Sequence, residues 1–487
     1  MKIVLFALNG SYSHTNLAIR CLRPALEREG YEVLLIESNL RDRKNSILNN
    51  LYKQKADIYS FSCYIWNIKE MLELACDLQS LLPDSRIIFG GPEASYDTER
   101  FSNIDYIDAI ICGEGEEAVA EICNKIRDGI KFEKVIHKSD RLKALPEGIL
   151  YREEDFAGHG RGTIVYYESS RGCPYSCAYC LSSAERGVWA KTVEETLSDL
   201  KDFESLDADF MIIKFVDRTF NFDIERANAI WQAIAGEEYT KKYHFEICAS
   251  LLNDESFEIF STMPKGKIQL EVGLQSTNAD TLSAVARHLD VSKTLENCMR
   301  IKEMGNIHLH LDLIAGLPYE DFSSFRRSFD AAYRCCDKLQ LGFLKLLHGT
   351  AIRERVEDYG YKYTKEPPYT VLESCWISYD EMNTLEKISF LLERYHESGN
   401  FDKCLEFVLE KEKSPFDFYL GLNDLIERND GREIQKISQA DAYSLLFAYA
   451  STRLSDVEKN EFSTLMHEDF KSREVRKPPK PIRTIYQ

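Results

Sequence analysis

The chain has 487 residues, with 61 Lys and Arg against 80 Asp and Glu, a formal net charge of −19. A composition of 44% hydrophobic and 29% charged residues excludes wholesale disorder, and the acidity argues against broad, non-specific nucleic-acid binding. No apolar run approaches the ~20 residues of a membrane span, and the length predicts about three domains. The 14 Cys are too sparse for a disulfide scaffold, so we expect a cytoplasmic protein with reduced thiols.

Residues 1–135 are predicted to form an α/β domain with a Rossmann-like (flavodoxin-like) parallel sheet. Apolar runs typical of strands lie at Ile3–Leu8, Val33–Ile36, Ile58–Ser62, Arg86–Phe89 and Ala109–Cys112. Amphipathic stretches such as Leu17–Leu26 and Ile68–Leu82 separate them, which is typical of β-α-β units. Ligands bind beyond the carboxyl ends of such strands, so the loops there predict a ligand site.

Residues 136–162 are charged and rich in Gly, and they are predicted to be a linker. A second alternating series over 163–360 predicts a partial (β/α)6 TIM-type barrel, with chemistry at its strand ends. Its strands are expected near Thr163–Glu168, Phe210–Val216, Tyr243–Ala249, Lys267–Gly273, His308–Ala315 and Leu339–Leu347. Thr192 and Glu195 have the spacing of a capping box at the start of a helix.

Residues 366–487, beyond Pro367 and Pro368, are predicted to form a mostly helical domain. The stretch from Lys471 to Gln487 carries six basic side chains and one acidic one. Such a tail favours contact with phosphate, although solvated tails of this composition are also common.

The most specific motif is the C-x-x-x-C-x-x-C of Cys173, Cys177 and Cys180, directly after the first barrel strand. Thiolates are soft ligands for iron–sulfur clusters, zinc or Cu(I). A closed zinc site needs four ligands, and no fourth lies nearby in the sequence. A zinc site completed from elsewhere in the chain remains the alternative.

This triplet resembles the signature of the radical S-adenosylmethionine (SAM) superfamily. The resemblance implies that Cys173, Cys177 and Cys180 hold a [4Fe–4S] cluster that binds SAM, and that Tyr179 packs near the adenine. It further assigns contacts to SAM to four residues near the ends of later strands, which are Glu246, Glu271, Gln275 and Asp312. The alternative for Glu246 and Glu271 is a structural ion pair in the barrel. The family's Gly-Gly-Glu motif is missing, and Val216–Asn221 stands in its place.

The N-terminal domain resembles the cobalamin-binding domain of radical SAM proteins whose cobalt lacks a His ligand. Neither G-x-G-x-x-G nor D-x-H-x-x-G is present. The resemblance implies cobalamin contacts in the loops after four strands, from Asn9, Ser13, His14, Thr15, Ser62, Tyr64, Trp66, Gly90, Gly91, Glu93, Ser95, Gly113, Glu114 and Gly115. We expect His14 to cap the helix at Leu17–Leu26 or to touch the corrin rather than to bind cobalt. Ordinary aromatic packing is the alternative for Tyr64 and Trp66.

Together these resemblances imply a cobalamin-dependent radical SAM enzyme that transfers a methyl group to an unactivated carbon through a 5′-deoxyadenosyl radical. One alternative is a radical rearrangement, cyclisation or redox reaction without methyl transfer, acting for example on modified RNA. Another is a cobalamin-binding protein without catalysis. The substrate class (small molecule, peptide or RNA) stays open, and an electron donor such as flavodoxin or ferredoxin is expected, with no membrane partner.

Overall fold

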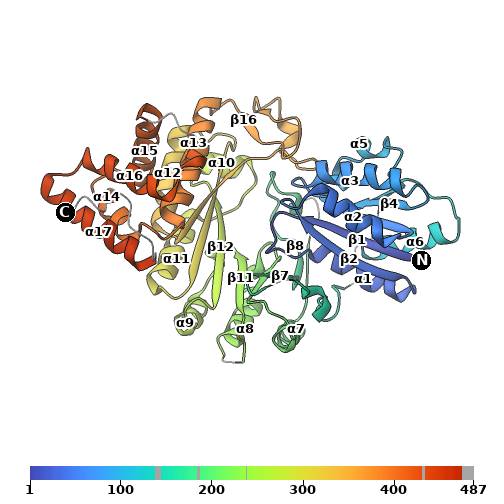
Figure 1. Ribbon diagram of the computed structural model, residues 1–487. Coiled ribbons are helices and arrows are strands. Elements are labelled where there is room, and N and C mark those ends of the chain that lie inside the picture. The colour runs from blue at the N-terminus through green and yellow to red at the C-terminus, as the bar shows by residue number, and fades with distance from the viewer. Residues whose placement is uncertain (138–143, 159, 184–186, 237, 430–433, 474–487) are drawn as a thin grey trace.

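The computed structural model describes residues 1–137, 144–158, 160–183, 187–236, 238–429 and 434–473. The chain forms an N-terminal α/β domain, a central barrel-like sheet and a C-terminal set of helices (Figure 1). The predicted fold class is confirmed in all three parts. Among the described residues, no helix is both long and apolar enough to cross a membrane.

The N-terminal domain is a six-stranded parallel sheet in the order β2-β1-β3-β4-β5-β6. Its strands are β1 (Lys2–Asn9), β2 (Glu32–Asn39), β3 (Ile58–Ser62), β4 (Arg86–Gly90), β5 (Ala109–Cys112) and β6 (Val135–His137). Its helices are α1 (Leu17–Arg28), α2 (Lys44–Gln54), α3 (Ile68–Leu81), α4 (Pro92–Tyr96), α5 (Thr98–Ser102) and α6 (Glu116–Arg127). The strand order reverses between β1 and β3, and ligands of such sheets bind at this switch point.

Each face of this sheet has its own apolar core. Ile19 and Leu26 of α1 pack with Ile122 of α6 on one face, whereas Leu51 of α2 and Met71 of α3 pack on the other. Burial on both faces explains why the strands are almost continuously apolar.

The segment predicted as a linker contains more structure than its composition indicates. Ile136 and His137 belong to β6, which pairs with β5, while Tyr151 and Phe156 are buried in the core of the barrel. A three-residue edge strand is too short to produce an alternating pattern, so the sequence did not reveal it.

The central sheet is parallel and sequential, in the order β7-β10-β11-β12-β13-β14. Its strands are β7 (Ile164–Tyr167), β10 (Ile212–Phe215), β11 (Lys242–Ile247), β12 (Ile268–Gln275), β13 (His308–Ala315) and β14 (Lys338–Phe343). Helices α7 (Val193–Ser205), α8 (Ile224–Ile234), α9 (Asp254–Thr262), α10 (Ala279–Ala284), α11 (Val291–Met304) and α12 (Phe322–Arg334) lie between them in the chain. The Thr192–Glu195 capping box is confirmed at the start of α7.

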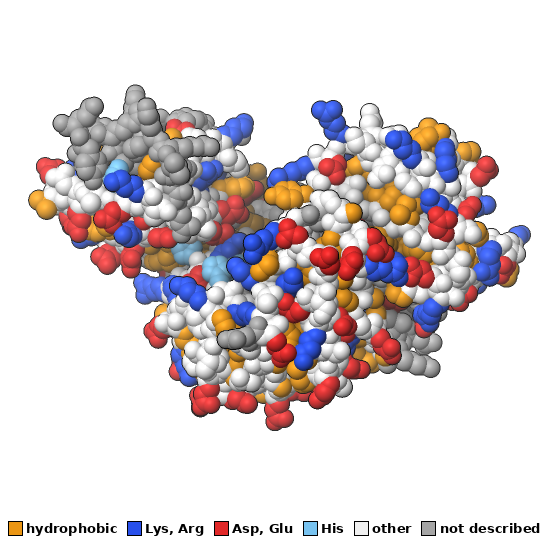
Figure 2. Space-filling model, turned by 60° about the horizontal axis from the view of Figure 1, so that its bottom comes forward, with side chains coloured by type: hydrophobic (Ala, Val, Ile, Leu, Met, Phe, Trp, Pro, Cys, Tyr) orange, Lys and Arg blue, Asp and Glu red, His pale blue; other side chains and the backbone are white. Residues whose placement is uncertain are grey.

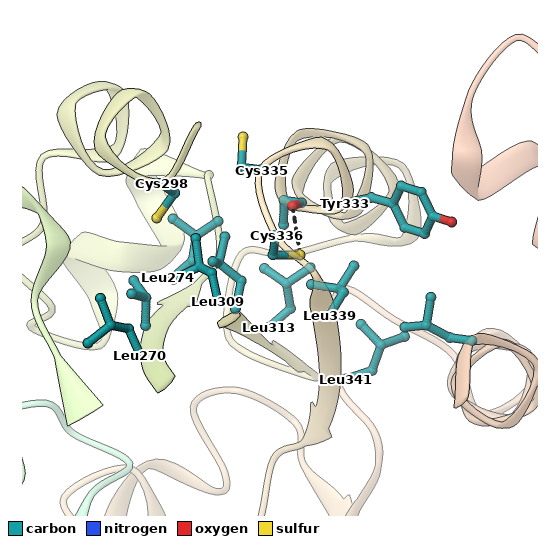
Figure 3. Packing of buried hydrophobic residues seen from close by; sticks show 14 of the residues in the cluster. Leu270, Leu274, Cys298, Leu309, Leu313, Tyr333, Cys335, Cys336, Leu339 and Leu341 are labelled. Carbon is teal, nitrogen blue, oxygen red and sulfur yellow. Dashed lines mark hydrogen bonds between the residues drawn. The ribbon is translucent and has the colours of Figure 1, made fainter. Parts of the chain in front are cut away.

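Leucines on alternate positions of β12, β13 and β14 pack outward against α11 and α12 (Figure 3). The buried thiol of Cys298 lies in the same cluster, and the Cys336 Sγ donates a hydrogen bond to the Ala332 carbonyl. Because side chains alternate along a strand, this packing leaves Glu271 and Asp312 on the inner face of the barrel.

The C-terminal domain begins with a short antiparallel pair, β15 (Lys362–Tyr363) and β16 (Val371–Glu373), before the predicted helices. The helices are α13 (Tyr379–Leu392), α14 (Asp402–Leu409), α15 (Pro415–Asn429), α16 (Gln439–Ser451) and α17 (Asp456–Arg473). Most of the predicted basic tail, residues 474–487, lies outside the described residues.

Candidate active site at the mouth of the barrel

The cysteine motif begins at the last residue of β8 (Ser170–Cys173) and continues on the loop to β9 (Gly187–Ala190), and the two strands form a small hairpin after β7. Cys177 is buried, whereas Cys173 and Cys180 are partly exposed. The backbone N–H of Ala178 donates to the Val285 carbonyl (2.9 Å), which fixes the loop to the segment after α10. Burial raises the pKa of the Cys173 thiol.

One pocket brings the three cysteines together with the carboxyl ends of the barrel strands. Of the residues predicted to contact SAM, all five line it, and they are Tyr179, Glu246, Glu271, Gln275 and Asp312. The residues come from positions up to about 140 apart in the chain, so the tertiary fold alone assembles them.

The thiols are not arranged around a single ion. Among the described residues, no group of three or more His, Cys, Asp or Glu side chains is placed to hold a metal ion. A four-iron cluster needs a different arrangement, because each thiolate binds a different iron atom. Because the motif thiols line one pocket without converging on a single ion, they fit a cluster with one open iron better than a closed zinc site.

Three buried polar atoms in this pocket have no hydrogen-bond partner, and they are Gln275 Oε1, Arg287 Nε and Asp312 Oδ1. Buried polar atoms are almost always paired in proteins, so unpaired atoms that share one pocket indicate a polar ligand there. This donor and acceptor set fits a polar ligand such as SAM.

The inner face of the barrel is polar. Lys214 Nζ lies 3.1 Å from Glu271 Oε2 and 3.8 Å from Glu246 Oε1, and His244 Nε2 lies 2.7 Å from Glu271 Oε2. Glu271 thus takes part in the structural ion pair that was the alternative, while Glu246 is held more loosely. Burial raises the pKa of Glu246, but the His244 hydrogen bond and the Lys214 charge outweigh burial and lower that of Glu271 to about 2.

Histidine and basic side chains gather in a hollow on the side of the molecule that Figure 2 brings forward. On the inner face of the barrel, the His310 ring hydrogen-bonds the Gln269 amide and lies 4.7 Å from the His308 ring. Barrel interiors are usually filled by branched apolar residues, so this polar lining is a distinct property of the chain.

Burial, followed by the charges of Glu271 and Glu246, raises the pKa of Asp312 to about 8. An unfolded Asp titrates near pH 3.9, so between about pH 4 and 8 the native state holds a proton that the unfolded state has lost. We therefore expect this group to reduce the free energy of unfolding by up to about 1.4 kcal/mol per pH unit as pH rises through that window. In urea unfolding, the free energy of unfolding of Asp312→Asn apoprotein should therefore rise relative to that of wild type between pH 5 and 8.

Asp337→Asn is the matched control, because contacts with His308 lower the pKa of Asp337 despite its burial. Its stability difference from wild type should not grow over the same range. An Asp312→Asn difference that stays constant from pH 5 to 8 would contradict the raised pKa.

Sequence reasoning missed two arginines and one threonine of this pocket. Arg287 donates to the Gly273 carbonyl, and its Nη1 lies 3.6 Å from Cys177 Sγ. Arg218 and Thr219 also line the pocket, and Thr219 Oγ1 lies 3.6 Å from Cys173 Sγ. The presence of Arg218 and Thr219 in the segment that replaces Gly-Gly-Glu was the one available signal.

Asp217, in the same segment, has a structural role. It is fully buried and accepts hydrogen bonds from the Ser169 N–H and hydroxyl and from the Ser170 hydroxyl, at 2.6–2.9 Å. These bonds fix the segment beside the cysteine hairpin.

The loop after β1 joins the N-terminal domain to the edge of the barrel. Ser13 and Thr15 exchange backbone hydrogen bonds with Ile164 of β7, and Thr15 Oγ1 also bonds the Tyr151 hydroxyl (2.8 Å). Asn9 holds this loop by donating to the His14 carbonyl (2.9 Å). The backbone of the predicted ligand loop therefore forms hydrogen bonds that join the two domains.

His14 does not cap the following helix, so that half of the expectation is wrong, and contact with the corrin stays a prediction. The cap is Asn16, whose Oδ1 accepts from the Ile19 N–H at 3.1 Å. His14 Nδ1 instead lies 2.6 Å from the hydroxyl of Tyr166 on β7, and burial lowers the pKa of His14. An aromatic partner from another domain could not be read from local sequence.

The loop after β3 lies at the switch point of the sheet. Ser62 is buried, and the Tyr64 and Trp66 rings stack with centroids 4.3 Å apart. Trp66 is 49% exposed, which is unusual for so large an apolar side chain. The pair thus offers an aromatic surface where the topology expects a ligand.

The loops after β4 and β5 carry the remaining predicted residues. Gly90 and Gly91 lead into α4, Glu93 is buried, and the Ser95 hydroxyl donates to the Gly91 carbonyl (2.8 Å). Beyond β5, Gly113 has a φ of +85° and Gly115 precedes α6.

Glu114 meets the barrel through Arg171, whose Nη1 lies 3.3 Å from the carboxylate. Arg171 Nη2 also contacts Glu116 (2.8 Å) and Glu168 (2.7 Å). One guanidinium thus joins the N-terminal loop to the hairpin that carries Cys173.

The sequence matches three families in chain order. Residues 3–123 match the B12 binding domain, residues 167–332 match the radical SAM superfamily, and residues 357–484 match a protein family of unknown function, DUF4080. The chain thus carries, in order, a B12 binding domain, a radical SAM domain and a domain of unknown function.

Two relatives are methyltransferases. The chain is 28% identical over 308 residues to 2-(S-pantetheinyl)-carbapenam-3-carboxylate methyltransferase of Streptantibioticus cattleyicolor, covering 55% of this chain and 44% of that protein. It is 27% identical over 393 residues to the cobalamin-dependent radical SAM methyltransferase TokK of Streptomyces tokunonensis, covering 72% and 56%. The chain thus spans about half the length of these relatives.

Among solved structures, the fold is similar to that of OxsB, a cobalamin-dependent SAM radical enzyme determined with aqua-cobalamin and SAM bound. The TM-score is 0.66 at 14% identity, over 99% of this chain and 83% of that one. This likeness covers all three domains and supports the fold.

Proposed function

We propose that the chain is a cobalamin-dependent radical SAM enzyme that transfers a methyl group to an unactivated carbon. The observation that carries the proposal is the pocket in which three thiols meet unpaired polar atoms at the strand ends. The B12 binding and radical SAM families matched by the chain, and the methyltransferase activity of its relatives, support the same activity.

Cys173, Cys177 and Cys180 would hold a [4Fe–4S] cluster, and Gln275, Arg287 and Asp312 would pair with SAM through their free atoms. When bound, the cluster and SAM supply a 5′-deoxyadenosyl radical, and cobalamin supplies the methyl group. The chain's own contribution is to orient these groups and to exclude water from a buried pocket.

In the N-terminal domain, the stacked pair of Tyr64 and Trp66 would lie against the corrin, at the switch point of the sheet. Gly113 would permit close approach of the ligand to the backbone, because a Cβ there would hold it away. Gly91 instead allows the loop after β4 to pack against Cys63. His14 bonds Tyr166 through Nδ1, and we expect it to lie beside the corrin rather than to bind cobalt.

The test uses the full chain, reconstituted anaerobically with iron, sulfide and hydroxocobalamin and then reduced. We expect about four irons and one cobalt per chain, and cleavage of SAM to 5′-deoxyadenosine. Labelled methyl groups of SAM, offered with pools of small molecules, peptides and RNA, should appear in one product together with S-adenosylhomocysteine.

Each departure from this result has a defined meaning. Cleavage of SAM with substrate conversion but no methyl gain would support a radical rearrangement or redox reaction. Cobalamin binding without SAM cleavage, even with strong reductant, would indicate a binding protein. Reconstituted protein that contains iron but no cobalt, after thorough loading, would overturn the proposed methyltransferase activity. A flavodoxin or ferredoxin should replace the chemical reductant.

A further inference from the structure

Residues 361–371, which we call the strap, begin the C-terminal domain and lie across the end of the barrel. The Leu346 N–H donates to the Tyr369 carbonyl (3.0 Å), and the Val371 N–H donates to the Leu344 carbonyl (2.8 Å). The strap therefore runs antiparallel to the segment from Leu344 to Leu346, which directly follows β14.

On the barrel side, the strap covers the end of β13. The Tyr361 hydroxyl donates to the Gly316 carbonyl (3.1 Å). Gly316 has a φ of +90°, and a Cβ there would lie 3.4 Å from Val371 Cγ1. Gly316 comes four residues after Asp312, so the strap packs on the strand that lines the cysteine pocket.

On the other side, the strap reaches the N-terminal domain through one buried hydrogen bond. The Tyr369 hydroxyl donates to the Glu93 carboxylate of α4, and the two side chains belong to residues only 1% and 3% exposed. The His348 ring packs edge-on against Tyr369, and its Nε2 lies 3.6 Å from Asp97 at the end of α4.

The Glu93 end of this bond is built rigidly into the predicted ligand loops. The Glu93 N–H donates to the Cys63 carbonyl (3.3 Å), and a Cβ on Gly91 would lie only 2.6 Å from that oxygen. The loop after β4 is thus pressed against the loop after β3, which leads to Tyr64. A shift of Glu93 must move both loops, because they are packed without a gap.

The Tyr369 end is also constrained. Tyr369 has a φ of +59°, a backbone conformation that non-glycine residues rarely adopt and that persists only where surrounding contacts hold it. The bond to Leu346 and the guanidinium of Arg353, 5.0 Å from the ring centroid, supply such contacts.

We propose that Tyr369 is a positioning residue for the ligand of the N-terminal domain, and that the DUF4080 domain retains this ligand by fixing Glu93 through the strap. The inference rests on the proposed function in that the ligand is taken to be cobalamin. The C-terminal domain thereby holds the two halves of the site together, because one segment packs on β13 and bonds to α4.

The test measures hydroxocobalamin binding to the full-length protein by visible absorption, as both dissociation constant and release rate. Tyr369→Phe leaves the buried Glu93 carboxylate without its donor, so we expect affinity to fall about tenfold, with faster release. Glu93→Gln keeps an acceptor for the phenol and serves as the background for a double-mutant cycle with Tyr369→Phe. In the Glu93→Gln background, Tyr369→Phe should reduce the affinity clearly less than in wild type, because the group left unpaired is neutral.

Tyr395→Phe is the matched control. Its hydroxyl donates to the Ala442 carbonyl (2.9 Å), is equally buried, and lies within the C-terminal domain. It should lower the melting temperature without changing hydroxocobalamin affinity. If Tyr369→Phe does the same, Tyr369 is only a stabilising residue and the inference is overturned.

Three results would overturn the inference. An equal loss of affinity in Glu93→Gln, independent of residue 369, would mean that Glu93 contacts the ligand directly. Wild-type protein that binds no hydroxocobalamin at all would remove the inference and the proposed function together. If wild type binds hydroxocobalamin and Tyr369→Phe binds it with the same affinity, the inference fails but the proposed function stands.

Discussion

Cys177→Ala protein should contain almost no iron after reconstitution and should cleave SAM at below about one per cent of the wild-type rate. Cys177 is the most buried of the three motif cysteines, and no other thiol of the described chain occupies an equivalent place on the loop. A four-iron cluster held by two thiolates would lose iron to solvent during reconstitution and desalting. Iron and sulfide analysis, the visible spectrum and 5′-deoxyadenosine release measure the effect.

Cys248→Ser provides a demanding control, because Cys248 lines the same pocket. Its Sγ accepts a hydrogen bond from the Tyr175 hydroxyl (3.4 Å), and it lies outside the motif. We expect this variant to keep its full iron content. Equal iron loss from Cys248→Ser, or full iron in Cys177→Ala, would contradict the assignment of the three ligands.

Arg171→Met should lower the free energy of unfolding by about 3–5 kcal/mol, the cost of removing one partner from a buried ion pair. Arg171 is the cation shared by Glu114, Glu116 and Glu168, and all four side chains are at most 20% exposed. Without it, three carboxylates face one another between the N-terminal loop and the cysteine hairpin. Urea unfolding of the apoprotein measures the loss.

Arg152→Met is the matched comparison, since Arg152 pairs with Glu27 in a more exposed contact, with side chains 45% and 34% exposed. Exposed pairs contribute about 0–1 kcal/mol, so this loss should be small. Adding Glu116→Gln to Arg171→Met should recover part of the stability. Equal losses in the two arginine variants would show that Arg171 is not a buried hub.

Local sequence determined the secondary-structure elements and the cysteine motif of this protein. Alternating and continuous apolar runs predicted the strands of both large sheets except β6, because side-chain burial on a sheet leaves a direct pattern. Thr192 and Glu195 predicted the start of α7, and the spacing of Cys173, Cys177 and Cys180 predicted a cluster-binding loop. These features depend on residues within a few positions of one another.

The tertiary structure alone decided which distant residues meet. Arg287 comes to Cys177, Tyr166 to His14 and Tyr369 to Glu93 across separations of 110, 152 and 276 residues. A hydrogen bond or ion pair depends on two side chains at one point in space, and neither sequence neighbourhood marks that partner. The contacts that bring distant residues together therefore follow from the fold, whereas the cysteine motif was present in the sequence.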